Sequence, residues 1–345
     1  MPARVPGLYG RRKPDHTRPA LDFSKYLTGE VPGHPDQVDY LAAMDGGWKL
    51  LGNGPDDSVF LGFPGCGDCE PVRWANTRRM VTKVLSGTEV YPDWDQVLAL
   101  YRTQNPDFDP HGDLSVNGPG SPADGGMDTQ TLLEHLVNVG GPDGVKAVCF
   151  GKIPVSNVPA VKAAVANFGY VWTDVDVLGC NQQEFADFEP WDYEANSAVD
   201  GGHAVLAGGY PTAQGTESGS LSGDIDFETW AEETSFTDAY WAHEVEQVWV
   251  VIWPEHLGTE EFLAGVDVRS LAADFEELTG KPFPAPVPPA PAPVPAPAPS
   301  PAPIPEPTPS PESLLAEFVA LVRLIAASAD RDIAEALAWA TTHGL

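Results

Sequence analysis

The sequence contains few cysteines and few basic residues, and it has no long apolar run. Four cysteines in 345 residues are too few for a disulfide-stabilised scaffold. Lys and Arg number 19 against 50 Asp and Glu, so the formal net charge is −31. Because phosphate repels such a polyanion, nucleic acid and acidic membrane surfaces are excluded as main partners.

The same scarcity of apolar runs bears on localisation. No segment reaches the apolar length of a transmembrane helix, so membrane insertion is not expected. The N-terminal region has positive charge but lacks the apolar core and small-residue cleavage site of a secretory signal peptide. We therefore expect a soluble protein that stays in the host cytoplasm during synthesis, with a later place in a virion left open.

The sequence contains enough hydrophobic residues for a core, and its charge is distributed unevenly along the chain. Hydrophobic residues make up 42% of the chain and aromatic residues 10%, which predicts that most of it folds. Residues 1–20 form a basic tail with five basic side chains and one acidic one, while the remainder is strongly acidic. This tail is expected to contact either the acidic domain that follows or a separate partner.

Proline marks the clearest boundary. Between Pro282 and Pro311, 16 of 30 residues are proline. Proline fixes φ and removes the amide donor, so residues 281–311 are predicted to be an extended polyproline II linker. A PxxP recognition motif is the alternative, but the length of the run favours a semi-rigid stalk.

Residues 312–345 follow the linker and are predicted to form a helix or a helical hairpin. Leu314, Phe318, Leu321 and Ile325 recur at helical spacing on one face. About thirty residues cannot bury such a face alone. We therefore predict self-association, or docking to a larger assembly, through this segment.

Residues 21–280 form the main domain, in which predicted helices precede most predicted strands. The helices are expected at 69–85, 94–104, 128–139, 157–169 and 266–280. The strands are expected at 144–153, 170–179, 201–210 and 245–253. This order favours an α+β fold over a doubly wound α/β sheet.

A glycine-rich turn, GCGDC, delivers Cys69 to the first turn of a predicted helix. The positive end of a helix dipole lowers a thiol's pKa and favours the nucleophilic thiolate. His203, in GGHAVLAGGY at the start of an apolar strand, is the best-placed base. It follows Cys69 by 134 residues, within the Cys-to-His separation of papain-like enzymes.

These residues resemble the papain-like cysteine peptidases. CGDC at 66–69 is similar to the turn that carries the family's nucleophile, and His203-Ala204-Val205 is similar to the segment that carries its imidazole. The resemblance is closest to a poorly characterised phage and actinobacterial branch and covers roughly residues 45–278. Further blocks carry it in the same order: LGN, QVLALY, MDTQTLLEHL, VPAVKAAVANFGYVWTDV, PWD, TW and SFTDAYWAHEVEQV.

The resemblance implies a two-lobed domain, with a helical left lobe containing Cys69 and a β-barrel-like right lobe containing His203. It also implies that Cys69 attacks an amide carbonyl of a peptide or protein substrate while His203 transfers the proton. Two further roles depart from the family's pattern. Asn53 is the nearest amide side chain for the oxyanion, and Glu228 stands where the family has the asparagine that orients the imidazole.

Other departures keep a second hypothesis open. Glu70 follows the nucleophile where the family usually has tryptophan, and a carboxylate there opposes thiolate formation. The chain is therefore either an active cysteine peptidase or amidase on a stalk, or a catalytically degenerate structural or binding module of a virion. Under the second hypothesis it would be a minor capsid, fibre or tail component.

No cofactor or metal is expected. A zinc site made of Cys66, Cys69 and His203 lacks a convincing fourth ligand. The acidic loop at 105–113 lacks the bidentate glutamate of a calcium loop. The resemblance implies that Cys66 is a half-cystine with Cys149 or Cys180 as its partner, while free core thiols are the alternative.

Overall fold

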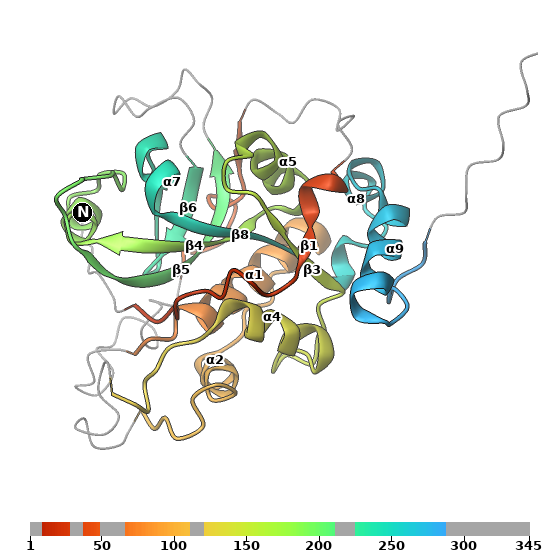
Figure 1. The fold of residues 1–345 in the computed structure, drawn as a ribbon, viewed down its shortest axis with the longest axis horizontal. Helices are drawn as coiled ribbons and strands as arrows, with labels where there is room; N and C mark the ends of the chain where they lie inside the picture. Colours follow the sequence, from red (N-terminus) through yellow and green to blue (C-terminus); the bar gives the residue numbers. More distant parts are fainter. Residues whose placement is uncertain (1–8, 28–36, 49–65, 111–120, 211–224, 288–345) are drawn as a thin grey trace, which may run out of the picture. The chain divides into compact units, whose positions relative to one another are not determined.

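The computed structural model describes residues 9–27, 37–48, 66–110, 121–210 and 225–287 (Figure 1). The chain divides into two compact units, Met1–Pro288 and Pro289–Leu345. Asn53 and the segment 312–345 lie outside the described residues, as does most of the Pro-rich segment. Among the described helices, none combines the length and apolar character needed to span a bilayer.

The first unit contains short helices around one central helix. The α-helices are α1 (Cys69–Ser86), α2 (Trp94–Tyr101), α4 (Thr129–Asn138), α5 (Val158–Phe168), α6 (Gly179–Ala186), α7 (Asp238–Glu244), α8 (Glu260–Gly265) and α9 (Val268–Thr279). Single 3₁₀ turns lie at Phe23–Lys25 and Pro254–His256. Most of α1 is buried, because helices and sheet pack around it (Figure 1).

The described strands form one eight-stranded, mostly antiparallel sheet. They are β1 (Leu21–Asp22), β2 (Val38–Asp39), β3 (Cys149–Ile153), β4 (Val171–Leu178), β5 (Val199–Tyr210), β6 (Ile225–Thr229), β7 (Glu232–Phe236) and β8 (Val245–Ile252). The order is β1-β3-β8-β4-β5-β6-β7, and β2 pairs with β5. The centre of the sheet is thus built from strands distant in sequence.

Helix ends follow local sequence signals. Asp93, Asp128 and Asn157 accept backbone hydrogen bonds as N-caps of α2, α4 and α5. Gly87 and Gly169 end α1 and α5 in the left-handed conformation, at φ 70° and 85°, which glycine adopts without steric cost.

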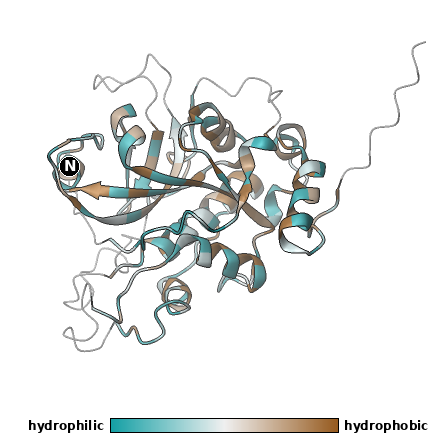
Figure 2. Cartoon of the chain, in the orientation of Figure 1, coloured by the Kyte–Doolittle hydropathy of each residue, from teal (hydrophilic) through white to brown (hydrophobic). Residues whose placement is uncertain are grey.

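Two groups of buried apolar side chains correspond to the two predicted lobes. One joins α1, α2 and α4 to one face of the sheet, and the other joins the sheet to α5, α7, α8 and α9. Figure 2 shows hydrophobic residues in the strands and on the helix sides that face them. The prediction of an α+β fold is confirmed.

The boundaries of two predicted strands differ from the sequence pattern. The strand expected at 144–153 begins at Cys149, because 141–144 form a turn that is closed by a hydrogen bond from the Gly144 amide to the Gly141 carbonyl. The strand expected at 201–210 begins at Val199. The hairpin of β6 and β7 was not predicted as such, although it supplies part of the candidate site.

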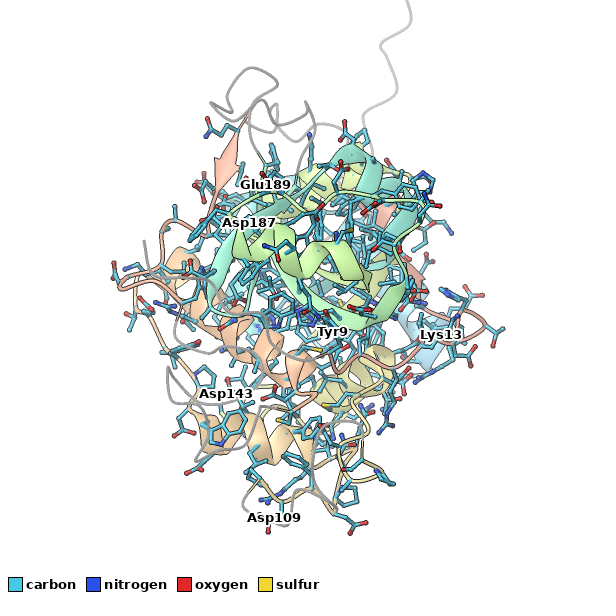
Figure 3. All side chains as sticks on the ribbon, turned by 90° about the vertical axis from the view of Figure 1, so that its left-hand side faces the viewer. Tyr9, Lys13, Asp109, Asp143, Asp187 and Glu189 are labelled. Atoms are coloured by element: carbon cyan, nitrogen blue, oxygen red, sulfur yellow. The ribbon has the colours of Figure 1, made fainter. Side chains whose placement is uncertain are left out.

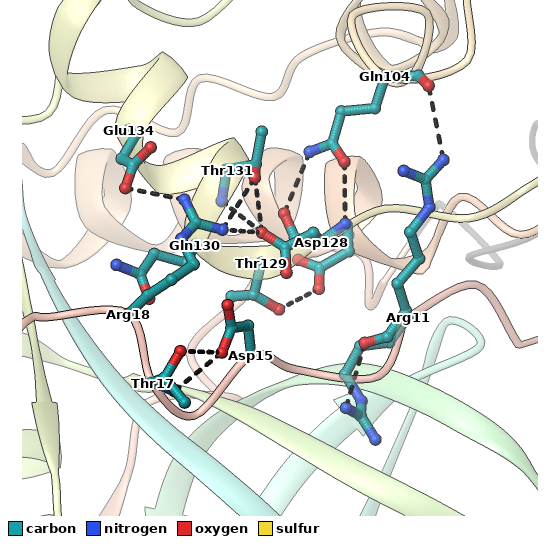
Figure 4. A network of polar contacts seen from close by, with 12 residues as sticks. Arg11, Asp15, Thr17, Arg18, Gln104, Asp128, Thr129, Gln130, Thr131 and Glu134 are labelled. Carbon is teal, nitrogen blue, oxygen red and sulfur yellow. Dashed lines mark hydrogen bonds and ion pairs between the residues drawn. The ribbon is translucent and has the colours of Figure 1, made fainter.

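The basic N-terminal segment packs along the acidic domain. Arg18 contacts Asp128 at 2.6 Å and Glu134 at 2.8 Å on α4 (Figure 4). Leu21 and Asp22 then pair with β3 as strand β1. Two partners were open for the basic tail, the acidic domain and a separate molecule. Residues 9–22 of the tail contact the acidic domain of the same chain.

Candidate active site

Cys69 is the first residue of α1 and lies against strand β5. Its side chain is buried, and the backbone of Ala204 is near enough to act on the pKa of its thiol, in the lowering direction. Ala204 directly follows His203. The fold therefore packs the helix that begins at Cys69 against the strand that carries His203, 134 residues later in the sequence.

His203 is held by the strand that follows β5 in the sheet. Its Nε2 atom lies 2.7 Å from the hydroxyl oxygen of Thr229, the last residue of β6. Its Nδ1 atom is buried and has no hydrogen-bond partner among the described residues. When Nε2–H donates to Thr229, Nδ1 carries the lone pair that a base needs.

Trp230 covers the imidazole. Its ring stacks on His203 with centroids 5.1 Å apart and planes 29° from parallel. Trp230 and Ala231 have φ values of 48° and 63° and form the two-residue turn between β6 and β7. Positive φ at both turn residues matches the twist of a tight hairpin, and here it places an indole over a candidate base.

Among the described residues, no hydrogen bond joins Glu228 to His203. Thr229, and not Glu228, contacts the imidazole at the position predicted for an orienting residue. Its carboxylate accepts hydrogen bonds from the Asn76 amide at 2.6 Å and the Ala231 backbone at 3.2 Å. Neighbouring residues of a strand face opposite sides of the sheet, so Thr229 reaches the imidazole and Glu228 points away from it. Burial raises the pKa of Glu228 to about 8.

Glu70, which the sequence gives as an obstacle to thiolate formation, is part of a buried ion network. Arg73 donates to Glu70 at 2.5 Å and to Asp174 on β4 at 2.7 Å. The Thr129 hydroxyl lies within hydrogen-bond distance of both carboxylates, and the Trp249 indole donates to Asp174. Burial raises the pKa of Glu70 to about 7, against the lowering effect of Arg73. The network ties the first turn of α1 to the sheet.

Burial sets the protonation of the pair. It raises the pKa of the Cys69 thiol well above its ordinary value, and Glu70 acts in the same direction. It lowers the pKa of His203 to about 3, with Arg73 and Arg11 adding to the effect. In this conformation Cys69 is therefore a neutral thiol and His203 a neutral imidazole.

The second cysteine of the turn lies among buried acids. Cys66 makes a hydrogen bond with Asp68, and Asp124 accepts one from the Gly67 amide at 3.0 Å. Burial and the charge of Asp124 raise the pKa of Asp68. All four cysteines are thiols, so the pairing of Cys66 with Cys149 or Cys180 is wrong and the thiol alternative holds.

The N-terminal strap, residues 9–12, lies across this site. The amide of Arg11 donates to the carbonyl of Gly202 at 3.0 Å, directly before His203. On the other side, Met127 donates to Gly10 and accepts from Arg12, each at 2.7 Å. Figure 3 shows Tyr9 in the middle of the face turned to the viewer. Its ring lies 6.0 Å from His203 and 6.2 Å from Trp230.

Glycines make this close approach possible. A Cβ on Gly10 would lie 1.8 Å from the carbonyl oxygen of Gly67, in the turn before Cys69. A Cβ on Gly126 would lie 2.1 Å from the carbonyl oxygen of Gly10, and one on Gly202 would lie 2.7 Å from the carbonyl oxygen of Arg11. The strap is thus in backbone contact with the segments that carry both Cys69 and His203.

The described residues contain no group of three or more His, Cys, Asp or Glu side chains placed to hold a metal ion. Asn53, predicted to help stabilise the oxyanion, lies outside the described residues.

Sequence reasoning missed Thr229, Trp230 and the strap. The dipeptide Thr229-Trp230 was recognised only as part of a family pattern, although it ends an alternating strand at a tight turn. The glycine pairs at 125–126 and 201–202 were the available signal for a close backbone approach. Nothing local in residues 9–12 indicates which segments they contact.

No protein-family model matches the chain, and no curated protein matches it. Solved structures that are similar to this chain include the following three. Xylellain, a cysteine protease from Xylella fastidiosa, is 15% identical, with 73% of this chain and 98% of that chain covered and a TM-score of 0.48. The Carica candamarcensis cysteine protease CMS1MS2, in complex with E-64, is 14% identical, with 63% and 98% covered and a TM-score of 0.41.

The third is the ragweed pollen allergen Amb a 11, a cysteine protease in its proform, with 15% identity, 65% and 67% coverage and a TM-score of 0.40. All three are cysteine proteases, the class that the sequence resembles.

Proposed function

We propose that the chain is a papain-like cysteine peptidase or amidase with Cys69 as nucleophile and His203 as base, held latent by the N-terminal strap. The observation that carries the proposal is that the helix that begins at Cys69 packs against β5, where His203 has a buried Nδ1 atom with no hydrogen-bond partner among the described residues.

In the reaction, Nδ1 of His203 takes the proton of the Cys69 thiol, and the thiolate attacks the carbonyl carbon of a peptide bond. The C–N bond breaks, the imidazolium returns its proton to the leaving amine, and an acyl thioester remains on Cys69. Water, deprotonated by His203, then attacks the thioester, releasing the carboxylic acid and restoring the thiol. Backbone amides at the start of α1 would stabilise the oxyanion.

Thr229 is proposed as the positioning residue for His203. The hydroxyl accepts from Nε2–H and fixes the tautomer that leaves Nδ1 basic. Trp230 covers this hydrogen bond from the same hairpin. The neutral state of the pair belongs to the strap-covered conformation, because the strap adds to the desolvation of both groups.

The test is hydrolysis of fluorescent casein by the full chain, by Gly10→Ala, and by Gly10→Ala combined with Cys69→Ala. We expect low activity in the full chain, higher activity in Gly10→Ala and none in Gly10→Ala/Cys69→Ala. The control, Cys180→Ala in the Gly10→Ala background, should keep the activity of Gly10→Ala. Activity that survives Cys69→Ala would refute the proposal. A folded Gly10→Ala protein without activity would favour the degenerate virion module instead.

We also propose that the catalytic unit is tethered through residues 281–311 and associates through residues 312–345. The support is the sequence alone, with its proline run and the apolar face of the predicted helix. Light scattering should give a smaller assembly for a chain ending at Gly280 than for the full chain. Equal masses with unchanged partner binding would contradict this, and absence from purified virions would count against a virion role.

A further inference from the structure

The strap inserts one charged side chain into the sheet. The guanidinium of Arg11 is almost fully buried, with a side-chain exposure of 1%. It contacts Asp176 at 2.5 Å, Glu246 at 2.7 Å and the Val175 carbonyl at 3.1 Å. These groups, on β4 and β8, are called the arginine pocket.

The arginine pocket is adjacent to the reacting groups. Val175 pairs with His203 across β4 and β5, and the backbone of Arg11 is bonded to Gly202, the residue before His203. The charge of Arg11 is close enough to help lower the pKa of His203. The unpartnered Nδ1 atom of His203 is buried beside it.

Carboxylates in this position require a cation. Burial raises the pKa of Asp176 and Glu246 adds to this, while Arg11 lowers it. Asp174, behind the pocket, already has Arg73 as its partner. Asp176 and Glu246 therefore lose their guanidinium partner when Arg11 leaves, and an incoming guanidinium would restore two charge-assisted contacts.

This inference rests on the proposed function. We propose that Asp176 and Glu246 are specificity-determining residues, which select peptide substrates with an arginine side chain. That arginine occupies the substrate position whose backbone amide donates to the Gly202 carbonyl, as the Arg11 amide does. The strap is held by the same contacts that such a substrate makes. A peptide that replaced the strap on the Gly202 carbonyl would have the arginine pocket in reach of its side chain at that position, as Arg11 does.

The first measurement is cleavage by the full-length Gly10→Ala protein, in which the strap is displaced. Quenched fluorescent peptides that differ only in arginine or citrulline, its neutral isostere, are compared by kcat/KM. We expect arginine to be favoured by about tenfold or more. The preference should fall to within threefold in Asp176→Asn/Glu246→Gln and persist in Glu277→Gln, which removes one exposed carboxylate on α9.

The second measurement is independent of catalysis. A fluorescein-labelled peptide with the sequence of residues 9–16, and its twin with citrulline at Arg11, are bound to Gly10→Ala/Cys69→Ala and followed by fluorescence polarisation. We expect the arginine peptide to bind about tenfold more tightly, with the same loss in the pocket variant. Absence of all cleavage would sink the proposed function while leaving this readout intact.

Equal affinities, or no binding of either twin, would overturn the arginine pocket. A binding preference in a protein that cleaves the arginine and citrulline peptides equally well would assign the pocket to the strap alone, and this would overturn it as a substrate determinant.

Discussion

His203 in β5 and Thr229 at the end of β6 lie 2.7 Å apart, between Nε2 and Oγ1. When Nε2–H donates in this contact, Nδ1 is the atom that can take a proton. A hydroxyl therefore occupies the place for which the sequence offered the carboxylate of Glu228.

Thr229→Val should lower kcat at least tenfold with little change in KM, because the shape is kept and the hydroxyl is lost. Thr229→Ser should restore most of it, since serine keeps the hydrogen bond. The measurement is kcat and KM of both variants in the Gly10→Ala background, with a pH profile. Equal kcat for valine and serine would show that the hydroxyl does not position the imidazole.

Gly10→Ala should expose Cys69, because its Cβ would lie 1.8 Å from the Gly67 carbonyl oxygen and the strap has to move away. Alkylation of Cys69 by iodoacetamide at neutral pH should then be at least tenfold faster than in the parent chain. Peptide mapping by mass spectrometry measures the rate at each cysteine.

The control for this labelling is Gly179→Ala, where the nearest atom to a new Cβ is at an ordinary 3.5 Å. It should leave the rate at Cys69 unchanged. If Gly10→Ala labels no faster than this control, the strap does not protect the thiol.

Arg73→Met should be strongly destabilising, because it leaves the buried carboxylates Glu70 and Asp174 without their cation. Removing one member of a buried pair costs about 3–5 kcal/mol. Lys83→Met, which breaks the more exposed ion pair with Asp45, should cost less than about 1 kcal/mol. Urea unfolding at neutral pH measures both, and losses of similar size would contradict the structural role of the network.

Glu228 predicts a fall in stability as pH rises. Its pKa increases on folding from an ordinary value near 4.5 to about 8, so the folded state holds a proton that the unfolded state releases. The free energy of unfolding should therefore decrease between about pH 5 and pH 8, by about 1.4 kcal/mol per pH unit or less. Glu228→Gln should flatten this decline, as measured by urea unfolding at pH 5, 6.5 and 8. A decline of equal slope in the variant would assign it to other groups.

Much of the fold and the choice of both Cys69 and His203 follow from local chemistry that is visible in the sequence. Capping side chains such as Asp93, Asp128 and Asn157 and terminal glycines such as Gly87 mark helix ends, because they satisfy backbone groups within a few residues. The glycine turn before Cys69 and the glycines before His203 likewise report their own backbone geometry.

Only the tertiary structure decided which groups meet. Whether Glu228 or Thr229 faces His203 depends on strand parity and on the register of β6 against β5, which a single strand does not specify. Glu70 pairs with the nearby Arg73, but the second carboxylate that Arg73 contacts, Asp174, lies about a hundred residues away on β4. The contact of Arg11 with Gly202, Asp176 and Glu246 has the same origin, because long-range packing and charge pairing, rather than any local pattern, put the N-terminal strap over the site.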